Sequence, residues 1–272
     1  MAEVAVGSGL LGAVMDAVKT VAAKEIMPRY LKVAQHRKSD GSLFTVADLA
    51  AQEALSTKLT AIYPGTIVGE EMTQREQAEQ WLAGDSGLWC VDPIDGTSNF
   101  VNGVPYFAVS VALMREGKSV LGVIYDPVAD EIFYAEKGEG AYLNGEPLPI
   151  KERAPRLSSA VASVDFKRLP ASLARELASS PPYASQRNCG ASTLEWCYVA
   201  AGRFDLYLHG SQKLWDYAAG SLILEEAGGA MCTLEDDDFW AGRLWTRSVI
   251  AALDHDLFDS WKSWLKSRLG NL

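Results

Sequence analysis

The sequence has few of the residues that build disulfide frameworks or soft-metal sites, with four cysteines and three histidines among 272 residues. No two cysteines form a C-x-x-C pair, and their spacing predicts neither a zinc site nor a disulfide framework. We therefore expect reduced thiols in a cytoplasmic protein. The four residues are Cys90, Cys189, Cys197 and Cys232.

Long hydrophobic runs and a basic leader are also missing. The longest apolar stretch in the middle of the chain, residues 106–114, is interrupted by Ser110 and is far shorter than the roughly 20 residues that span a bilayer. Residues 1–11 are mildly apolar, but no basic residue precedes Lys19, so the charged region of a signal peptide is lacking. These absences predict a soluble protein that has no membrane partner.

Basic residues are outnumbered, 25 against 35 acidic ones, and the formal net charge is −10. Nucleic acids are held by clustered Lys and Arg, and only short basic groupings such as residues 36–38 occur here. Nucleic acid is therefore not expected as a partner. The hydrophobic fraction of 48% and the charged fraction of 22% are typical of a globular domain, which at this length needs no disulfides.

The first half of the chain, residues 1–155, predicts helices on a mainly antiparallel sheet. Apolar residues at helical spacing, and aromatic or β-branched runs between turn residues, carry this prediction. The expected helices are 10–30 and 45–62, and the expected strands are 66–69, 88–91, 106–114, 119–125 and 131–135. Asn144-Gly145 adds the signal of a tight turn.

The second half, residues 156–272, alternates between helical and strand patterns and predicts an α/β arrangement. The expected helices are 170–179, 192–201, 214–227 and a closing helix at the C-terminus, and the expected strands are 203–208, 230–233 and 248–252. No repeat and no low-complexity linker separates the halves. We therefore expect a single domain of residues 1–272, with its functional site where the halves meet.

Acidic residues follow one of the apolar strands closely. Asp92 comes directly after residues 88–91, and Asp95 lies three residues further on. Two carboxylates this close raise each other's pKa unless a cation lies between them. Oxygen ligands without His or Cys favour Mg²⁺ over zinc or copper. Gly96 and Thr97 then open an expected helix whose free N–H groups suit an anion, so the segment predicts a phosphate-hydrolysing site.

Each acidic motif also has an ordinary structural explanation. The Asp95-Gly96 pair is usually a turn, and Glu70-Glu71 is usually a solvated surface pair. Asp216 is a stronger candidate because its neighbours are apolar and burial without a partner would be costly, although a helix N-cap also explains it. Aspartyl-phosphate phosphatases are excluded because one residue, not two, separates their two Asp. An EF-hand is excluded because its further ligands are missing.

Three motifs together resemble the inositol monophosphatase family. They are Gly69-Glu70-Glu71, Asp92-Pro93-Ile94-Asp95-Gly96-Thr97 and Trp215-Asp216-Tyr217-Ala218-Ala219-Gly220. The similarity covers roughly residues 10–265, and residues 38–40 and 45–48 also resemble the family's upstream segment. The resemblance implies a layered α-β-α-β-α sandwich of the inositol monophosphatase / fructose-1,6-bisphosphatase type, in the α+β / α/β class, and a homodimer.

The resemblance implies a metal site of two or three Mg²⁺ ions. Glu70, Asp92 and the Ile94 carbonyl would bind one ion, Asp92, Asp95 and Asp216 a second, and a looser third would lie near Glu70. Glu70 is thus expected in catalysis as well as in metal binding. The implied reaction is attack of a metal-activated water on the phosphorus, without a covalent intermediate, and it is expected to be inhibited by lithium.

The resemblance further implies that Asp48 pairs with Thr97 to orient or deprotonate the attacking water. Gly96 and Thr97 would offer N–H groups, and Thr97 its hydroxyl, to the phosphate. The organic part of the substrate, a small phosphorylated metabolite, would be lined by Gly190, Ala191 and Ser192.

The sequence leaves the substrate open. Relatives that prefer inositol phosphates often carry a Glu seven residues before the last metal Asp, and His209 stands there. The resemblance implies that His209 points into the substrate cleft, where with Lys213 and Arg187 it would attract a second anionic group. Inositol monophosphate or a related sugar or polyol phosphate is the first expectation. The alternatives are 3′(2′),5′-bisphosphate nucleotidase, fructose-1,6-bisphosphatase or histidinol-phosphatase activity, and a non-catalytic regulatory binding protein.

Overall fold

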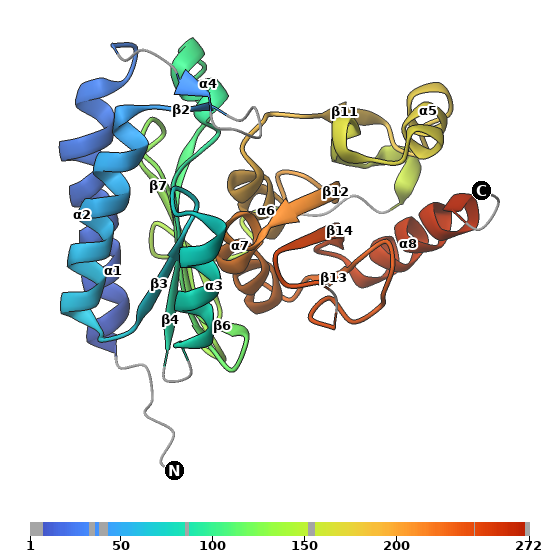
Figure 1. Ribbon diagram of the computed structural model, residues 1–272. Helices are drawn as coiled ribbons and strands as arrows, with labels where there is room; N and C mark the ends of the chain where they lie inside the picture. Colours follow the sequence, from blue (N-terminus) through green and yellow to red (C-terminus); the bar gives the residue numbers. More distant parts are fainter. Residues whose placement is uncertain are drawn as a thin grey trace.

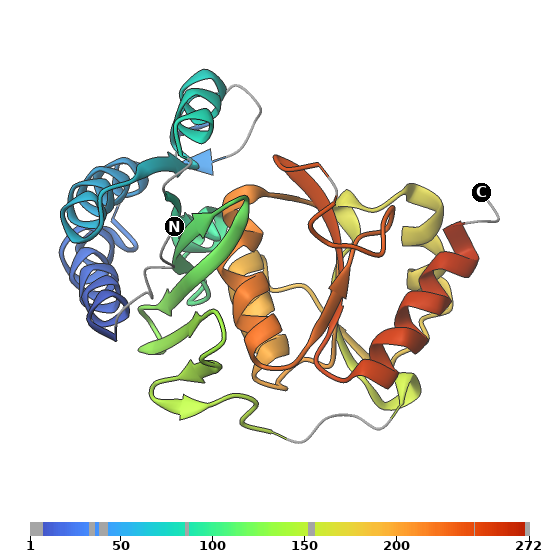
Figure 2. The same ribbon diagram turned by 90° about the horizontal axis from the view of Figure 1, so that it is seen from below.

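Two large sheets and three groups of helices form alternating layers in the computed structural model, which describes residues 8–32, 36–37, 43–84, 87–151, 156–241 and 243–269 (Figure 1). Figure 2 shows one helix pair outside the first sheet, a second pair between the sheets and a third outside the second sheet. The pairs are α1 (Ser8–Val21) with α2 (Val46–Ile62), α6 (Ser192–Ala200) with α7 (Leu214–Glu226), and α5 (Ala171–Ser179) with α8 (His255–Leu269). The expected α-β-α-β-α sandwich is confirmed.

The first sheet has seven strands in the order β3-β4-β5-β6-β7-β8-β9. They are β3 (Thr66–Gly69), β4 (Leu88–Asp95), β5 (Ala108–Arg115), β6 (Lys118–Asp126), β7 (Glu131–Glu136), β8 (Ala141–Leu143) and β9 (Glu146–Pro147). All neighbours pair antiparallel except β3 and β4, which are parallel and place Gly69 opposite Val91. This register places Glu70, the residue after β3, beside Asp92 of β4.

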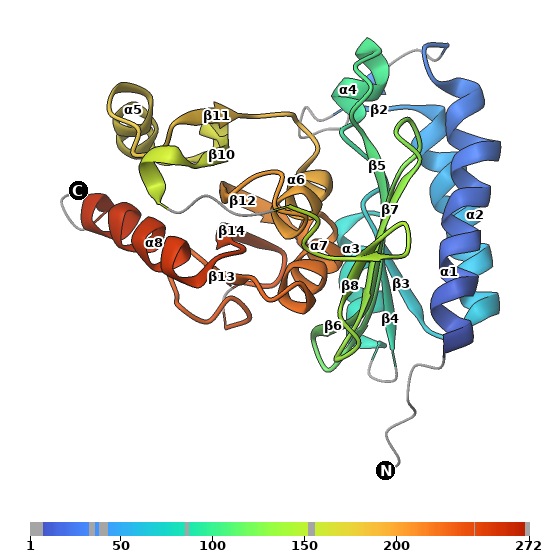
Figure 3. The same cartoon turned by 180° about the vertical axis from the view of Figure 1, so that it is seen from behind.

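The second sheet has five strands in the order β11-β10-β12-β14-β13, visible from behind in Figure 3. They are β10 (Val161–Asp165), β11 (Ser185–Arg187), β12 (Leu206–Lys213), β13 (Ala230–Cys232) and β14 (Thr246–Ala252). Strand β12 is parallel to β10 and antiparallel to β14, and its pairing with β14 is irregular between His209 and Gln212. Sequence patterns alone missed β10 and β11 and ended the strand of β12 at residue 208.

The N-terminal helix differs from the expectation of one helix over residues 10–30. The α-helix ends at Val21, a π-helical turn covers Ala22–Ile26, and a 3-10 turn covers Met27–Arg29. Pro28 lacks an N–H group, which explains why regular α-helical bonding does not continue there. The other short elements are β1 (His36–Arg37), β2 (Leu43–Phe44), α3 (Gln74–Leu82), α4 (Thr97–Asn102), η3 (Leu157–Ser159) and η4 (Phe166–Arg168).

Aromatic side chains fill the spaces between the layers. Trp89, Trp196 and Trp261 are among the largest fully buried side chains, and each belongs to a different apolar cluster. The four cysteines are free, as their spacing predicts. In the described part of the chain, no helix has both the length and the apolar character needed to cross a membrane.

Candidate active site

A polar cavity of about 370 Å³ lies where the ends of both sheets meet α4, α6 and α7. Most of the predicted site residues line it. Asp48, Ala191 and the two expected cations, Lys213 and Arg187, do not. The residues that do are Glu70, Asp92, Ile94, Asp95, Gly96, Thr97, Gly190, Ser192, His209 and Asp216. The fold thus brings together residues that are up to 146 positions apart, from Glu70 to Asp216.

Three carboxylates form a compact cluster in this cavity. One oxygen of each of Asp92, Asp95 and Asp216 lies within 4.8 Å of the other two. Asp92 and Asp95 come from the end of β4, and Asp216 comes from the first turn of α7, so both halves contribute. Asp92 is 2% exposed and Asp95 is 9% exposed. The cluster is therefore largely shielded from solvent.

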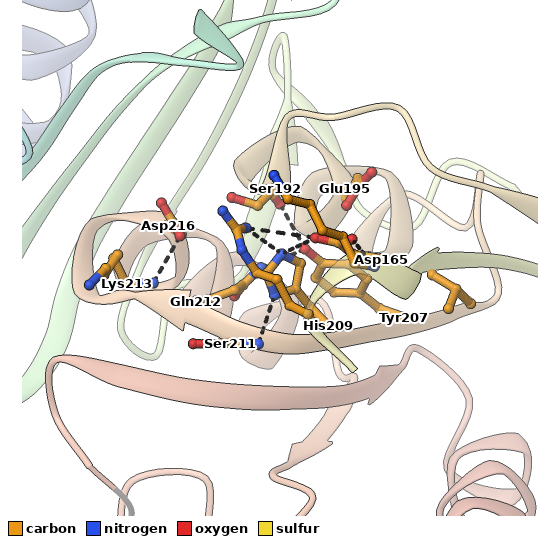
Figure 4. Close-up of polar contacts among 12 residues, drawn as sticks. Asp165, Ser192, Glu195, Tyr207, His209, Ser211, Gln212, Lys213 and Asp216 are labelled. Atoms are coloured by element: carbon orange, nitrogen blue, oxygen red, sulfur yellow. Dashed lines mark hydrogen bonds and ion pairs between the residues drawn. The ribbon is translucent and has the colours of Figure 1, made fainter. Parts of the chain in front are cut away.

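Hydrogen bonds from the backbone fix one oxygen of each carboxylate. Asp92 accepts from the N–H of Ile94 at 3.1 Å. Asp216 accepts from the N–H of Lys213 at 2.8 Å, as Figure 4 shows. The Oδ2 atom of Asp95 accepts from Thr193 twice, from the N–H at 2.6 Å and from the hydroxyl at 2.7 Å. A carboxylate held through one oxygen can still offer the other to a cation.

Burial and repulsion raise the pKa values in this cluster. Burial is the larger cause for Asp92, whose pKa lies well above its usual range, and the charges of Glu70, Asp95 and Asp216 add to it. The pKa of Asp216 rises to about 8 for the same reasons. Buried like charges of this kind fit a divalent cation that neutralises them. Because all of the donors are oxygen atoms, the cluster suits Mg²⁺ better than a soft metal.

The raised pKa values predict that the metal-free protein loses stability as the pH rises. Unfolded Asp has a pKa of about 3.9, so ionising Asp216 costs folding free energy between that pH and its folded pKa of about 8. Buried Asp48 and Glu195, raised to about 6 and about 7, act in the same direction. In EDTA, the urea midpoint should therefore be lower at pH 8 than at pH 5.

Two comparisons check the cause of this pH dependence. Saturating Mg²⁺ should shrink the difference in urea midpoint between pH 5 and pH 8. Asp216→Asn in EDTA should reduce this difference as well, because either change removes repulsion between the carboxylates. A wild-type midpoint in EDTA that is equal or higher at pH 8 would contradict the prediction.

A hydroxyl and a buried carboxylate lie beside the cluster. The Thr97 hydroxyl is 3.0 Å from the Ile94 carbonyl oxygen and 3.4 Å from Oδ1 of Asp48. The other oxygen of Asp48 accepts from the Thr45 N–H at 2.6 Å and from the Thr45 hydroxyl at 2.7 Å, which caps α2. Burial raises the pKa of Asp48 to about 6. Asp48 is thus a fixed, weakly basic carboxylate that reaches the cavity through Thr97.

The loop before α6 packs against the start of α4. Gly96 has φ +86°, and a Cβ added there would lie 3.0 Å from the Ala191 side chain and 3.2 Å from the Tyr106 carbonyl oxygen. Only glycine suits both conditions. The Asn99 amide donates to the Cys189 and Tyr106 carbonyls at 2.7 and 2.8 Å and ties the loop to α4. Ala191 is fully buried in this contact, whereas Gly190 and Ser192 line the cavity.

His209 lines the cavity but is only 2% exposed, and its ring contacts Asp165 and Ser211 (Figure 4). Lys213 and Arg187, the cations expected beside His209, do not line the cavity. Lys167 and Arg168 line it instead. Asp165, Lys167 and Arg168 were missed because β10 was missed. Residues 161–164, which are apolar except for Ser163, precede Asp165 and weakly repeat the pattern of a strand ending in a carboxylate, which is a local signal for them.

Comparisons with known proteins agree with these motifs. The model of the inositol monophosphatase family matches residues 8–263. An inositol-1-monophosphatase from Caulobacter vibrioides is 36% identical over 209 residues, 74% of this chain and 80% of the relative. A protein named Nus factor SuhB from Pasteurella multocida is 37% identical over 201 residues, 72% of this chain and 73% of the relative.

Two solved structures are similar over nearly the full length. The extragenic suppressor protein suhB from Bartonella henselae has a TM-score of 0.82 at 29% identity, covering 95% of this chain and 99% of that chain. The IMPase from Thermotoga maritima has a TM-score of 0.81 at 27% identity, covering 96% and 98%. The similar proteins thus carry phosphatase names, a Nus factor name and a suppressor protein name.

Proposed function

Because this chain belongs to the inositol monophosphatase family, we propose that it is a Mg²⁺-dependent phosphatase that hydrolyses a small phosphate monoester. Family membership and the names of relatives indicate a phosphatase. The observation that carries the finer proposal is the buried cluster of Asp92, Asp95 and Asp216 beside the Thr97–Asp48 pair. The first substrate class is inositol monophosphate or a related sugar or polyol phosphate.

In this proposal, two or three Mg²⁺ ions are held by Glu70, Asp92, the Ile94 carbonyl, Asp95 and Asp216. When bound, Mg²⁺ supplies Lewis-acid activation of water and neutralises charge on the phosphate. The donor set supports this assignment because it is made of oxygen atoms alone, and burial makes the uncompensated cluster costly. Lithium sensitivity, a homodimer and a cytoplasmic location belong to the same proposal.

The protein's own groups orient the nucleophile. The attacking water donates a hydrogen bond to the Thr97 hydroxyl oxygen, and the Thr97 proton lies between Asp48 and the Ile94 carbonyl. Asp48 can then accept a proton through Thr97 while the water oxygen bonds to phosphorus and the bond from phosphorus to the ester oxygen breaks. The leaving oxygen takes a proton from solvent and departs as the alcohol. The N–H groups of Gly96 and Thr97 hold the phosphate. Thr97 itself forms no bond to phosphorus.

A second candidate function is regulatory binding through a protein surface. The relative named Nus factor SuhB favours it. A purely regulatory role, however, gives no reason to keep a buried carboxylate cluster that costs stability without a metal.

The deciding experiment measures phosphate release from a panel of monoesters with Mg²⁺ and with EDTA. We expect turnover of at least one sugar or polyol phosphate that requires Mg²⁺, and inhibition by Li⁺ at tens of millimolar. If the folded protein binds Mg²⁺ but releases no phosphate from any member, the regulatory candidate replaces the phosphatase.

A further inference from the structure

The cavity has one acidic side and one basic side. The acidic side is the carboxylate cluster around Asp92, and the basic side is η4, which contributes Lys167 and Arg168. A ligand that fills the cavity therefore meets the metal cluster at one end and two cations at the other.

Strand β12 holds η4 in place through its irregular stretch. A Cβ added to Gly210 would lie 1.8 Å from the Arg168 carbonyl oxygen and 2.8 Å from the Leu169 nitrogen. The backbone of η4 therefore packs directly on Gly210, and no other residue fits there. The position of Arg168 is set by this close approach and not only by its flexible side chain.

His209, the residue before Gly210 in β12, fixes the side chain of Asp165, which directly precedes η4. Nδ1 of His209 accepts from the Ser211 N–H at 3.2 Å, and Nε2 is 3.1 Å from Oδ2 of Asp165. An Nδ1 atom that accepts from Ser211 assigns the proton to Nε2, which faces both the Asp165 carboxylate and, at 3.2 Å, Nη1 of Arg168. Burial lowers the pKa of His209 and favours this neutral form. His209 is thus an anchor for Asp165 rather than a cation of the cavity.

Asp165 in turn positions Arg168. Its Oδ1 atom accepts from the Lys167 N–H at 2.9 Å, and Oδ2 lies 3.7 Å from Nη1 of Arg168. Burial opposes ionisation of Asp165, but its bonds from His209 and the Lys167 N–H and the charge of Arg168 outweigh burial and lower its pKa. The Arg168 side chain is 48% exposed and keeps donors beyond Nη1 for a ligand.

We propose that Arg168 is a specificity-determining residue that binds an anionic substituent, a carboxylate or a second phosphate, on the leaving group of the substrate. This rests on the proposed phosphatase function, which places the scissile phosphate at the carboxylate cluster. Guanidinium groups bind both anions through charge-assisted bonds. Lys167 adds a second positive charge at the same end of the cavity.

The test compares matched pairs of substrates. 3-Phosphoglycerate has a carboxylate where glycerol 3-phosphate has a hydroxymethyl group, and fructose 1,6-bisphosphate adds a second phosphate to fructose 1-phosphate. We expect wild-type kcat/KM to favour the anionic member of at least one pair, and the favoured pair identifies the substituent. Arg168→Gln should lower that anionic-to-neutral ratio by about 10- to 100-fold, the value of a charged hydrogen bond.

Two variants sharpen the comparison. Arg168→Lys should retain part of the ratio, because the charge remains. Arg175→Gln makes the same charge change on exposed α5 and should leave the ratio unchanged. Equal kcat/KM within both wild-type pairs, or an equal loss for both members in Arg168→Gln, would overturn the proposal. Wild-type inactivity toward all four compounds, with turnover of inositol 1-phosphate in the same assay with Mg²⁺, would overturn this proposal alone, whereas inactivity toward inositol 1-phosphate as well would count against the phosphatase proposal.

Discussion

Asp92→Asn is expected to lower kcat/KM for phosphate release by about 10³-fold or more, even at saturating Mg²⁺. Asp92 is 2% exposed and lies in the carboxylate cluster, where asparagine keeps the acceptor for the Ile94 N–H but loses the charge. Metal catalysis contributes several kcal/mol of transition-state stabilisation, and each 1.36 kcal/mol is tenfold in rate. Phosphate release and the Mg²⁺-induced rise in Tm should fall together.

The control for Asp92→Asn is Asp126→Asn, which changes another buried carboxylate of the same sheet. Asp126 accepts from the N–H groups of Val128 and Ala129, lies outside the cavity, and should leave turnover close to wild type. In EDTA, Asp92→Asn should be at least as stable as wild type, because one buried charge is removed. Near-normal turnover of Asp92→Asn with saturating Mg²⁺ would contradict the metal assignment.

The acidic motifs could be predicted because their signals are local. An apolar strand that ends in carboxylates is visible around Asp92, and apolar neighbours mark Asp216 as a costly residue to bury without a partner. The strand β3 was predicted with its observed bounds, 66–69. Its parallel pairing with β4, which places Glu70 beside Asp92, has no local signal, because register depends on contacts between distant segments.

The basic side of the cavity has a weaker local signal, and its position depends in the same way on distant segments. Arg168 reaches the site only because β10 pairs with β12 in parallel, with Asp165 opposite His209, and because Gly210 admits the η4 backbone. Strand β10 has five residues, too few for a clear periodic pattern. Residues 38–40, which resemble the family's upstream segment, lie outside the described residues. The substrate-binding roles of His209 and Ala191 stay predictions.

Thr97→Ala is expected to lower kcat by about 10²- to 10⁴-fold, the usual scale for a group that orients or relays a proton. The hydroxyl is within 3.4 Å of the Asp48 carboxylate and within 3.0 Å of the Ile94 carbonyl, so its removal leaves the water without an orienting partner. The KM and the Mg²⁺ concentration for half-activation should change little, because neither property needs the hydroxyl. Steady-state phosphate release over a range of Mg²⁺ concentrations measures all three.

Thr97→Ser separates the hydroxyl from the rest of the side chain. Serine keeps the group that bonds to Asp48, so its kcat should stay within about tenfold of wild type. A loss in Thr97→Ala that is reversed by more Mg²⁺ would instead assign the hydroxyl to positioning the Ile94 carbonyl as a metal ligand. Mass spectrometry during turnover gives the last check. A phosphothreonine at position 97 would show that Thr97 attacks phosphorus itself and would overturn its role as the residue that orients water.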